Sequence, residues 1–92
     1  MPTLSQAEIT LRLASVPQWR IEREELTRTF SFSDFRAALT FVNRVGEAAE
    51  KAGHHPDIDI RYNKVRLALI THDAGGLTAK DFDLATAVND IR

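Results

Sequence analysis

Residues 57–69 constrain the fold most, because apolar and polar side chains alternate along them. Alternation with a period of two is typical of strands that bury one face. A two-residue turn at Asn63-Lys64 would pair Tyr62 with Val65 and Ile60 with Leu67, so that both apolar sets share one face. We therefore predict a hairpin with Tyr62 packed on its covered face. The apolar positions are Ile58, Ile60, Tyr62, Val65, Leu67 and Leu69.

A second hairpin is predicted earlier in the chain. Trp19 and Ile21 indicate a short strand, and Arg23-Glu24-Glu25 is predicted to form a polar turn. From Leu26 to Phe32 apolar residues again occupy one side and small polar residues the other, which predicts the partner strand.

Three helices are predicted from their capping signals. Ser5-Gln6-Ala7-Glu8 matches a capping box, and Pro17 stops the helix that follows. Thr78-Ala79-Lys80-Asp81 repeats the pattern for the last helix. The middle helix is predicted to start with Ser33 as its cap and to end at Gly53, a residue suited to the left-handed conformation. Its apolar face would consist of Phe35, Ala38, Leu39, Val42, Val45 and Ala49.

The predicted element order is helix, two strands, helix, two strands, helix. This order predicts an α+β fold in which residues 1–92 form a single domain. The domain would be a two-layer sandwich, with a four-stranded antiparallel sheet and three helices on one face. Four strands leave two open edges that need protection from unwanted pairing, which favours a homo-oligomer.

The composition narrows the possible functions. The chain has no cysteine, which excludes disulfides, thiolate nucleophiles and cysteine metal ligands. Its net charge is −1 and its arginines are scattered, so direct binding of nucleic acid is not expected. No apolar run approaches the roughly 20 residues of a membrane span, and the start lacks the features of a signal peptide. We expect a cytoplasmic protein with no membrane contact.

The strongest chemical signal is a pair of adjacent histidines. His54 and His55 follow the predicted helix end, Glu50 lies one helical turn before His54, and His72 closes the next strand pair. Imidazole changes charge near neutral pH and a nearby carboxylate favours its charged form, so the cluster suits general acid–base catalysis. A metal site is the rival interpretation. It would combine His72, one histidine of the pair and Glu50 or an aspartate, because consecutive side chains point apart.

These residues resemble the signature of the pterin-4a-carbinolamine dehydratases. The shared pattern is Glu50-x3-His54-His55-Pro56-x5-Tyr62-x9-His72-x8-Asp81, and the resemblance extends over nearly the whole chain. It implies a 4a-hydroxytetrahydrobiopterin dehydratase, which is a lyase. Such an enzyme converts 4a-hydroxy-tetrahydropterin (pterin-4a-carbinolamine) to quinonoid dihydropterin and water by histidine acid–base catalysis.

The resemblance also implies the setting of the reaction. The pterin substrate is what remains after a pterin-dependent aromatic amino acid hydroxylase has used its cofactor, so the enzyme would serve tetrahydrobiopterin recycling. Neither a metal nor a bound cofactor is implied. Family members assemble as dimers or tetramers.

Residue by residue, the resemblance implies a catalytic set of three histidines. His54 and His72 match the family's acid–base residues, and His55 matches one concerned mainly with substrate binding. Asp81 is explained equally well as a capping residue, and Trp19 as a core residue. The substrate-binding residues implied by the resemblance are Glu50, Pro56, Thr71, Asp73, Asp81 and Trp19.

Two other functions stay open. Animal relatives of this fold serve as dimerisation cofactors of a homeodomain transcription factor, so the chain could be a non-catalytic protein-dimerisation or transcriptional cofactor module. Such a module would not need all three histidines. A pterin-binding protein without this activity, for example one near molybdopterin metabolism, would keep the pocket but change the ligand.

Overall fold

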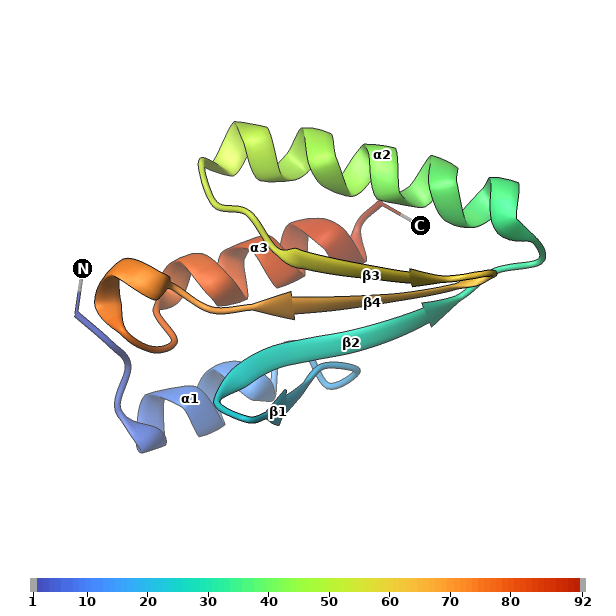
Figure 1. The fold of residues 1–92 in the computed structure, drawn as a ribbon. Coiled ribbons are helices and arrows are strands. Elements are labelled where there is room, and N and C mark those ends of the chain that lie inside the picture. The colour runs from blue at the N-terminus through green and yellow to red at the C-terminus, as the bar shows by residue number, and fades with distance from the viewer. Residues whose placement is uncertain (1, 92) are drawn as a thin grey trace.

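Four strands form one antiparallel sheet in the order β1-β2-β4-β3 (Figure 1). The computed structural model describes residues 2–91. The α+β class and the predicted element order are confirmed. The strands are β1 (Arg20–Glu22), β2 (Glu25–Ser31), β3 (Asp57–Arg61) and β4 (Lys64–Leu69). The helices are α1 (Gln6–Leu13), α2 (Phe35–Ala52) and α3 (Ala79–Asn89), with a 3-10 turn, η1, at His72–Ala74.

One hydrophobic core lies between the sheet and the helices. The central strands β2 and β4 contribute fully buried side chains, and residues from all three helices pack against the same cluster. The prediction of three helices on one face is therefore confirmed. Each large apolar side chain buried in this way contributes about 1.5–3 kcal/mol relative to leaving it exposed. The core residues of the sheet are Leu26, Phe30, Val65, Leu67 and Leu69.

The caps predicted for the first and last helices are confirmed, and the cap predicted for α2 is wrong. Both capping boxes form, and in the first of them the Ser5 amide, which donates to the Glu8 carboxylate at 2.8 Å, lowers the pKa of Glu8. In α2 the cap is Asp34, whose carboxylate accepts from the Ala37 amide at 2.8 Å, and not Ser33. The reason is that Phe32 is still hydrogen-bonded to Asn63, which keeps the chain extended and shifts the start of the helix toward the C-terminus.

The second hairpin has a different register from the predicted one. Ile60 pairs with Val65 and Ile58 with Leu67, so the turn consists of Tyr62 and Asn63. The shift is two residues, which leaves the same side chains on the apolar face. Tyr62 instead occupies the turn with φ 51° and is 67% exposed, so the prediction that it packs on the covered face is wrong.

The first hairpin turn is also tighter than predicted. Glu22 pairs with Glu25, so the turn consists of Arg23 and Glu24, both with positive φ (51° and 67°). Two left-handed residues in succession are typical of the hairpin turn whose twist matches the flanking strands.

The uncovered face of the sheet is polar and linked by side-chain bonds. Glu22 accepts from the Arg66 guanidinium at 3.1 Å and from the Thr27 hydroxyl at 3.0 Å, and these bonds lower the pKa of Glu22. A lowered folded pKa means that the stabilisation is present above the unfolded pKa and is lost as the pH falls through the folded one.

The buried face of α2 is rotated relative to the prediction. Ala38, Val45 and Ala49 are buried as predicted, together with Phe41, whose ring lies 4.6 Å from that of Phe30 between centroids. Phe35 and Leu39, which were placed on the buried face, are 46% and 38% exposed. An apolar strip of α2 is therefore left uncovered by the described residues.

The end of α2 directs the two adjacent histidines to opposite sides. Gly53 adopts the predicted left-handed conformation with φ 64°, and the His54 amide bonds back to the carbonyl of Ala49. His54 then lies inside the molecule, 9% exposed, whereas His55 is exposed. Within residues 2–91, no helix has the combined length and apolar character needed to cross a bilayer.

We expect Gly53→Ala to lower the free energy of unfolding by about 1–2 kcal/mol, because an L side chain resists the left-handed conformation. Apart from the adjacent residues of the chain, no atom lies within 4 Å of a Cβ built at this position, so a clash with other parts of the fold cannot be the cause. Gly53→Asn is the matched control and should cost less, because asparagine tolerates positive φ. Urea denaturation measures both. Equal losses would contradict the backbone explanation.

Candidate active site

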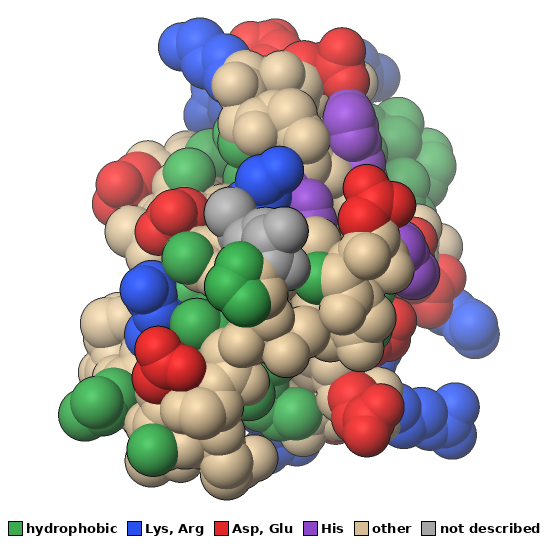
Figure 2. Space-filling model, turned by 90° about the vertical axis from the view of Figure 1, so that its left-hand side faces the viewer, with side chains coloured by type: hydrophobic (Ala, Val, Ile, Leu, Met, Phe, Trp, Pro, Cys, Tyr) green, Lys and Arg blue, Asp and Glu red, His purple; other side chains and the backbone are tan. Residues whose placement is uncertain are grey.

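A cleft of about 270 Å³ brings the three histidines together at one end of the sheet. Figure 2 shows this end of the molecule, where histidine side chains lie among acidic and basic ones. His54 and Thr71 are buried. The exposed side chains that form the rim of the cleft are those of His55, His72, Asp73 and Lys80. The cleft is lined by Gly53, His54, His55, Ile70, Thr71, His72, Asp73 and Lys80.

A buried hydrogen bond to Asp81 holds His54 at the floor of the cleft. Its Nε2 lies 2.6 Å from Oδ1 of Asp81, a side chain with no exposed surface. The other carboxylate oxygen accepts from the hydroxyl of Thr71 and the amide of Thr78, both at 2.9 Å. Because a carboxylate accepts, Nε2 must donate, and Nδ1 is the nitrogen left for other chemistry.

The Nδ1 atom of His54 is open to the cleft. It has no hydrogen-bond partner within residues 2–91, yet no fully buried side-chain nitrogen or oxygen of these residues lacks a partner. It follows that Nδ1 keeps contact with solvent. Asp81 therefore leaves His54 one fixed donor nitrogen and one accessible nitrogen that can exchange a proton.

The two interpretations of Asp81 that the sequence left open are both partly supported. Its carboxylate caps α3 through the Thr78 amide, and the same carboxylate orients His54. Asp81 lies behind His54 and does not line the cleft. The predicted direct contact with substrate is therefore not supported by this geometry.

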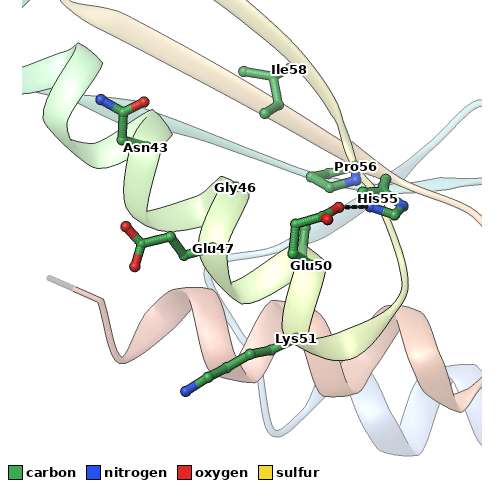
Figure 3. A pocket seen from close by; sticks show the side chains of 9 residues that line it. Asn43, Gly46, Glu47, Glu50, Lys51, His55, Pro56 and Ile58 are labelled. Atoms are coloured by element: carbon green, nitrogen blue, oxygen red, sulfur yellow. Dashed lines mark hydrogen bonds and ion pairs between the residues drawn. The ribbon is translucent and has the colours of Figure 1, made fainter.

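Glu50 pairs with His55 and not with His54, contrary to the interpretation based on helical spacing. The distance between Oε2 of Glu50 and Nε2 of His55 is 2.5 Å (Figure 3). The left-handed Gly53 lies between them and redirects the chain, so that the side chain five residues on faces Glu50. Both groups are largely exposed, so the pair contributes about 0–1 kcal/mol to stability and mainly orients the ring.

Glu50 and Pro56 line a second, more open groove of about 1000 Å³, between α2 and the edge strand β3. His55 lines both the groove and the cleft. Figure 3 shows Glu50, His55 and Pro56 at the same end of this groove, with Ile58 further along β3. The predicted substrate-binding residues Glu50 and Pro56 thus line the neighbouring groove, and His55, which lines both, connects this groove to the cleft.

The segment of η1 contributes the exposed rim. Neither the His72 ring nor the Asp73 carboxylate forms a hydrogen bond or ion pair within residues 2–91, and both line the cleft. Thr71 lies between them and the buried network, because its hydroxyl bonds Asp81. The structure thus brings Thr71, His72 and Asp73 together at the cleft.

Trp19 is not brought to the cleft. Its side chain is 3% exposed in the core, and its indole nitrogen donates to Oδ1 of Asn89 at 2.8 Å. Asn89 ends α3 and Asp81 lies in its first turn, about 12 Å away along the helix axis at 1.5 Å per residue. The structure therefore supports the interpretation of Trp19 as a core residue.

Sequence reasoning missed three lining residues, Gly53, Ile70 and Lys80, of which Gly53 was predicted only as the end of a helix. The available signal was position: Lys80 directly precedes Asp81 in the first turn of α3. The rival metal site is not assembled, because no three His, Asp or Glu side chains of the described chain lie close enough together to hold an ion.

Comparison with known proteins identifies the family. A family model described as pterin 4 alpha carbinolamine dehydratase matches residues 2–91. The chain belongs to the pterin-4-alpha-carbinolamine dehydratase family. Candidate dehydratases of this name from Chloroflexus aurantiacus and Acidobacterium capsulatum are 62% and 60% identical to it. Each alignment covers 99% of this chain, and 98% and 99% of the two relatives.

One solved structure agrees with this family assignment, and a second shares the fold. The crystal structure of a transcriptional coactivator/pterin dehydratase from Brucella melitensis matches with a TM-score of 0.92 and 34% identity over 97% of each chain. A pterin dehydratase-like protein identified as a RuBisCO assembly factor matches with a TM-score of 0.68. Its sequence is 21% identical, and the alignment covers 80% of this chain and 88% of that protein. This likeness therefore shows a shared fold only.

We expect Asp81→Ala to destabilise the protein by about 3–5 kcal/mol, because it breaks a buried pair and removes the acceptor of two further hydrogen bonds. Asp83→Ala is the matched control in the same helix. Asp83 is exposed, and its loss should change stability by less than about 0.5 kcal/mol. Chemical denaturation measures both variants, and similar values for the two would contradict the structural role of the Asp81 carboxylate.

Proposed function

We propose that the chain is a 4a-hydroxytetrahydrobiopterin dehydratase that converts 4a-hydroxy-tetrahydropterin to quinonoid dihydropterin and water. The observation that carries the proposal is the cleft in which three histidines meet, with His54 fixed by Asp81 and its Nδ1 accessible. Membership of the pterin-4-alpha-carbinolamine dehydratase family supports the same reaction.

The reaction requires two proton transfers. The bond between C4a and the hydroxyl oxygen breaks, and the departing oxygen receives a proton to leave as water. The proton on N5 is removed, and its bonding electrons form the double bond between C4a and N5. Imidazole can perform both steps near neutral pH, and a positioned acid or base typically contributes 10²–10⁴-fold. The reaction changes no oxidation state overall, so it needs no oxidant or reductant, and the proposal assigns both proton transfers to side chains.

His54 and His72 are the proposed acid–base pair. His54 offers one accessible nitrogen in a fixed orientation, whereas the His72 ring has no partner within residues 2–91 and both of its nitrogens are available. His55, oriented by Glu50, would bind the pterin together with Thr71 and Asp73. Lys80 joins them as a further lining residue, and Asp81 acts through His54.

The proposed setting is recycling of tetrahydrobiopterin in the cytoplasm. The substrate is the hydroxylated pterin that an aromatic amino acid hydroxylase leaves, so such a hydroxylase would be the functional partner. Residues 1–92 would act as one domain. The absence of cysteine is consistent with this compartment.

We also propose that the chain forms a homo-oligomer, a dimer or a tetramer. Strand β3 is an edge strand with an open side, and such edges are normally protected. Ile58 on β3 and Leu39 and Phe35 on α2 are exposed apolar side chains on the elements that border the open groove. An uncovered apolar strip beside a free strand edge favours contact with a second copy.

The alternative function is a non-catalytic pterin-binding or protein-dimerisation module acting as a transcriptional cofactor. The same apolar strip supports it, and the similar Brucella protein is described as a transcriptional coactivator/pterin dehydratase. A module of this kind gives no reason for His54 to keep an accessible Nδ1 in a cleft shared with His72. We therefore place it second.

We expect wild-type protein to accelerate the absorbance change of freshly made 4a-hydroxy-tetrahydropterin. His54→Ala and His72→Ala should each lower kcat by about 10²-fold or more, because each removes one proton-transfer group. His55→Ala should mainly raise KM. Trp19→Phe is the control, since a core residue away from the cleft should leave KM unchanged.

The same assay across pH tests the chemistry. Imidazole changes charge between about pH 5 and 8, so the rate should vary within this range. A flat profile would count against the histidines. A wild-type rate equal to that of buffer would contradict the enzyme and favour the binding module.

Light scattering should give the mass of a dimer or tetramer for the wild type. Ile58→Lys should shift the population toward monomer, because a charge at this exposed apolar position of the edge strand β3 would be desolvated on contact. Thr10→Lys places the same charge on an exposed position of α1 and should leave the mass unchanged. A monomeric wild type, or equal effects of both substitutions, would contradict the proposed surface.

A further inference from the structure

The segment that precedes α1 lies against the loop that follows His72. Figure 1 shows the start of the chain beside η1, and the Leu4 amide donates to the carbonyl of Leu77 at 2.9 Å. Thr3 packs on the same loop, since a Cβ built at Gly76 would lie 3.1 Å from its Cγ2. This spacing is tighter than ordinary van der Waals contact, so the approach depends on the missing side chain of Gly76.

Gly76 closes the loop that carries His72. The Thr71 amide donates to the Gly76 carbonyl at 3.1 Å, and the two residues form an isolated bridge outside the main sheet. Gly75, with φ 77°, completes the turn between them. The Thr71–Gly76 bridge is therefore the base of the loop, and His72 and Asp73 are held above it.

The same bridge connects to His54. The Thr71 hydroxyl donates to Asp81, and Asp81 accepts from His54. A continuous chain of contacts thus runs from Thr3 through Gly76 and Thr71 to the buried network, and His72 directly follows Thr71. Both proposed proton-transfer residues are therefore connected to the Thr71–Gly76 bridge, and Gly76 in turn packs against Thr3.

We propose that the contact between Thr3 and Gly76 positions His54 and His72 for catalysis. This inference rests on the proposed dehydratase function. Neither Thr3 nor Gly76 lines the cleft, so both are positioning residues and not catalytic ones. Positioning by remote contacts matters because a displacement of about 1 Å at a reacting group can cost about 10²-fold in rate.

Gly76→Ala tests the contact. Gly76 does not have a positive φ, so alanine acts through its Cβ, which must push Thr3 and the loop apart by a few tenths of an ångström. We expect kcat to fall about tenfold with KM within about twofold, since the change displaces reacting groups without removing a binding group. The melting temperature reports whether the variant is folded.

The double variant Gly76→Ala with Thr3→Ser provides the rescue. Serine lacks the Cγ2 methyl that the new Cβ meets, so kcat should return to within about twofold of the wild type. Thr3→Ser alone removes the same methyl and leaves a gap in the contact, so it should lower kcat severalfold, whereas in the double variant the new Cβ of residue 76 fills that gap. If Gly76→Ala does not fold, Thr3→Gly loosens the contact from the other side and should lower kcat in the same way.

A readout without substrate separates this inference from the proposed function. The Thr71 amide, bonded to Gly76, should exchange its hydrogen at least about threefold faster in Gly76→Ala and return to the wild-type rate in the double variant. The ring signals of His54 and His72 should shift and return with it. If the variants give these exchange and ring-signal results but the wild-type protein has no dehydratase activity, the proposed function is overturned and the role of the contact is supported. Unchanged exchange in Gly76→Ala, or a loss of kcat that Thr3→Ser does not restore, would overturn the contact.

Discussion

The buried carboxylate of Asp81 joins three segments that are far apart in the sequence. It accepts from the ring of His54 after α2, from the hydroxyl of Thr71 before η1 and from the amide of Thr78 at the start of α3. Because the Asp81 side chain has no exposed surface, each of these bonds is strong, and each missing partner would be costly. The carboxylate therefore fixes the ends of two helices and one loop relative to one another.

The hydrophobic core brings these segments within reach of one carboxylate. Leu69 at the end of β4 is buried against the helices, which places Thr71 two residues later at the edge of the core. Leu77 and Phe82, on either side of the α3 cap, are buried in the same cluster and hold the start of that helix. The apolar contacts set the approximate arrangement, and the polar network then selects one orientation for His54.

Local signals predicted the elements well, and the errors arose where local patterns allow more than one answer. Capping boxes and the left-handed Gly53 were correct because they depend on neighbouring residues only. The β3–β4 register was off by two residues, because such a shift keeps the same side chains on the apolar face. Leu39 was placed on the wrong side of α2 because the choice between it and Phe41 depends on how the helix lies on the sheet.

The sequence singled out the three histidines that line the cleft, but it did not predict their hydrogen-bond partners. Spacing along the chain gathered His54, His55 and His72, yet which acid serves which histidine depends on the backbone after Gly53. That turn sends His55 toward Glu50 and His54 toward an aspartate 27 residues away.

His54 and His72 are therefore held in different ways, and the sequence alone could not reveal this difference. One histidine is locked in place with a single accessible nitrogen, and His72 stands on a short exposed loop. The relative position of the two then depends on whatever holds that loop at its base, which in this chain is the Thr71–Gly76 bridge.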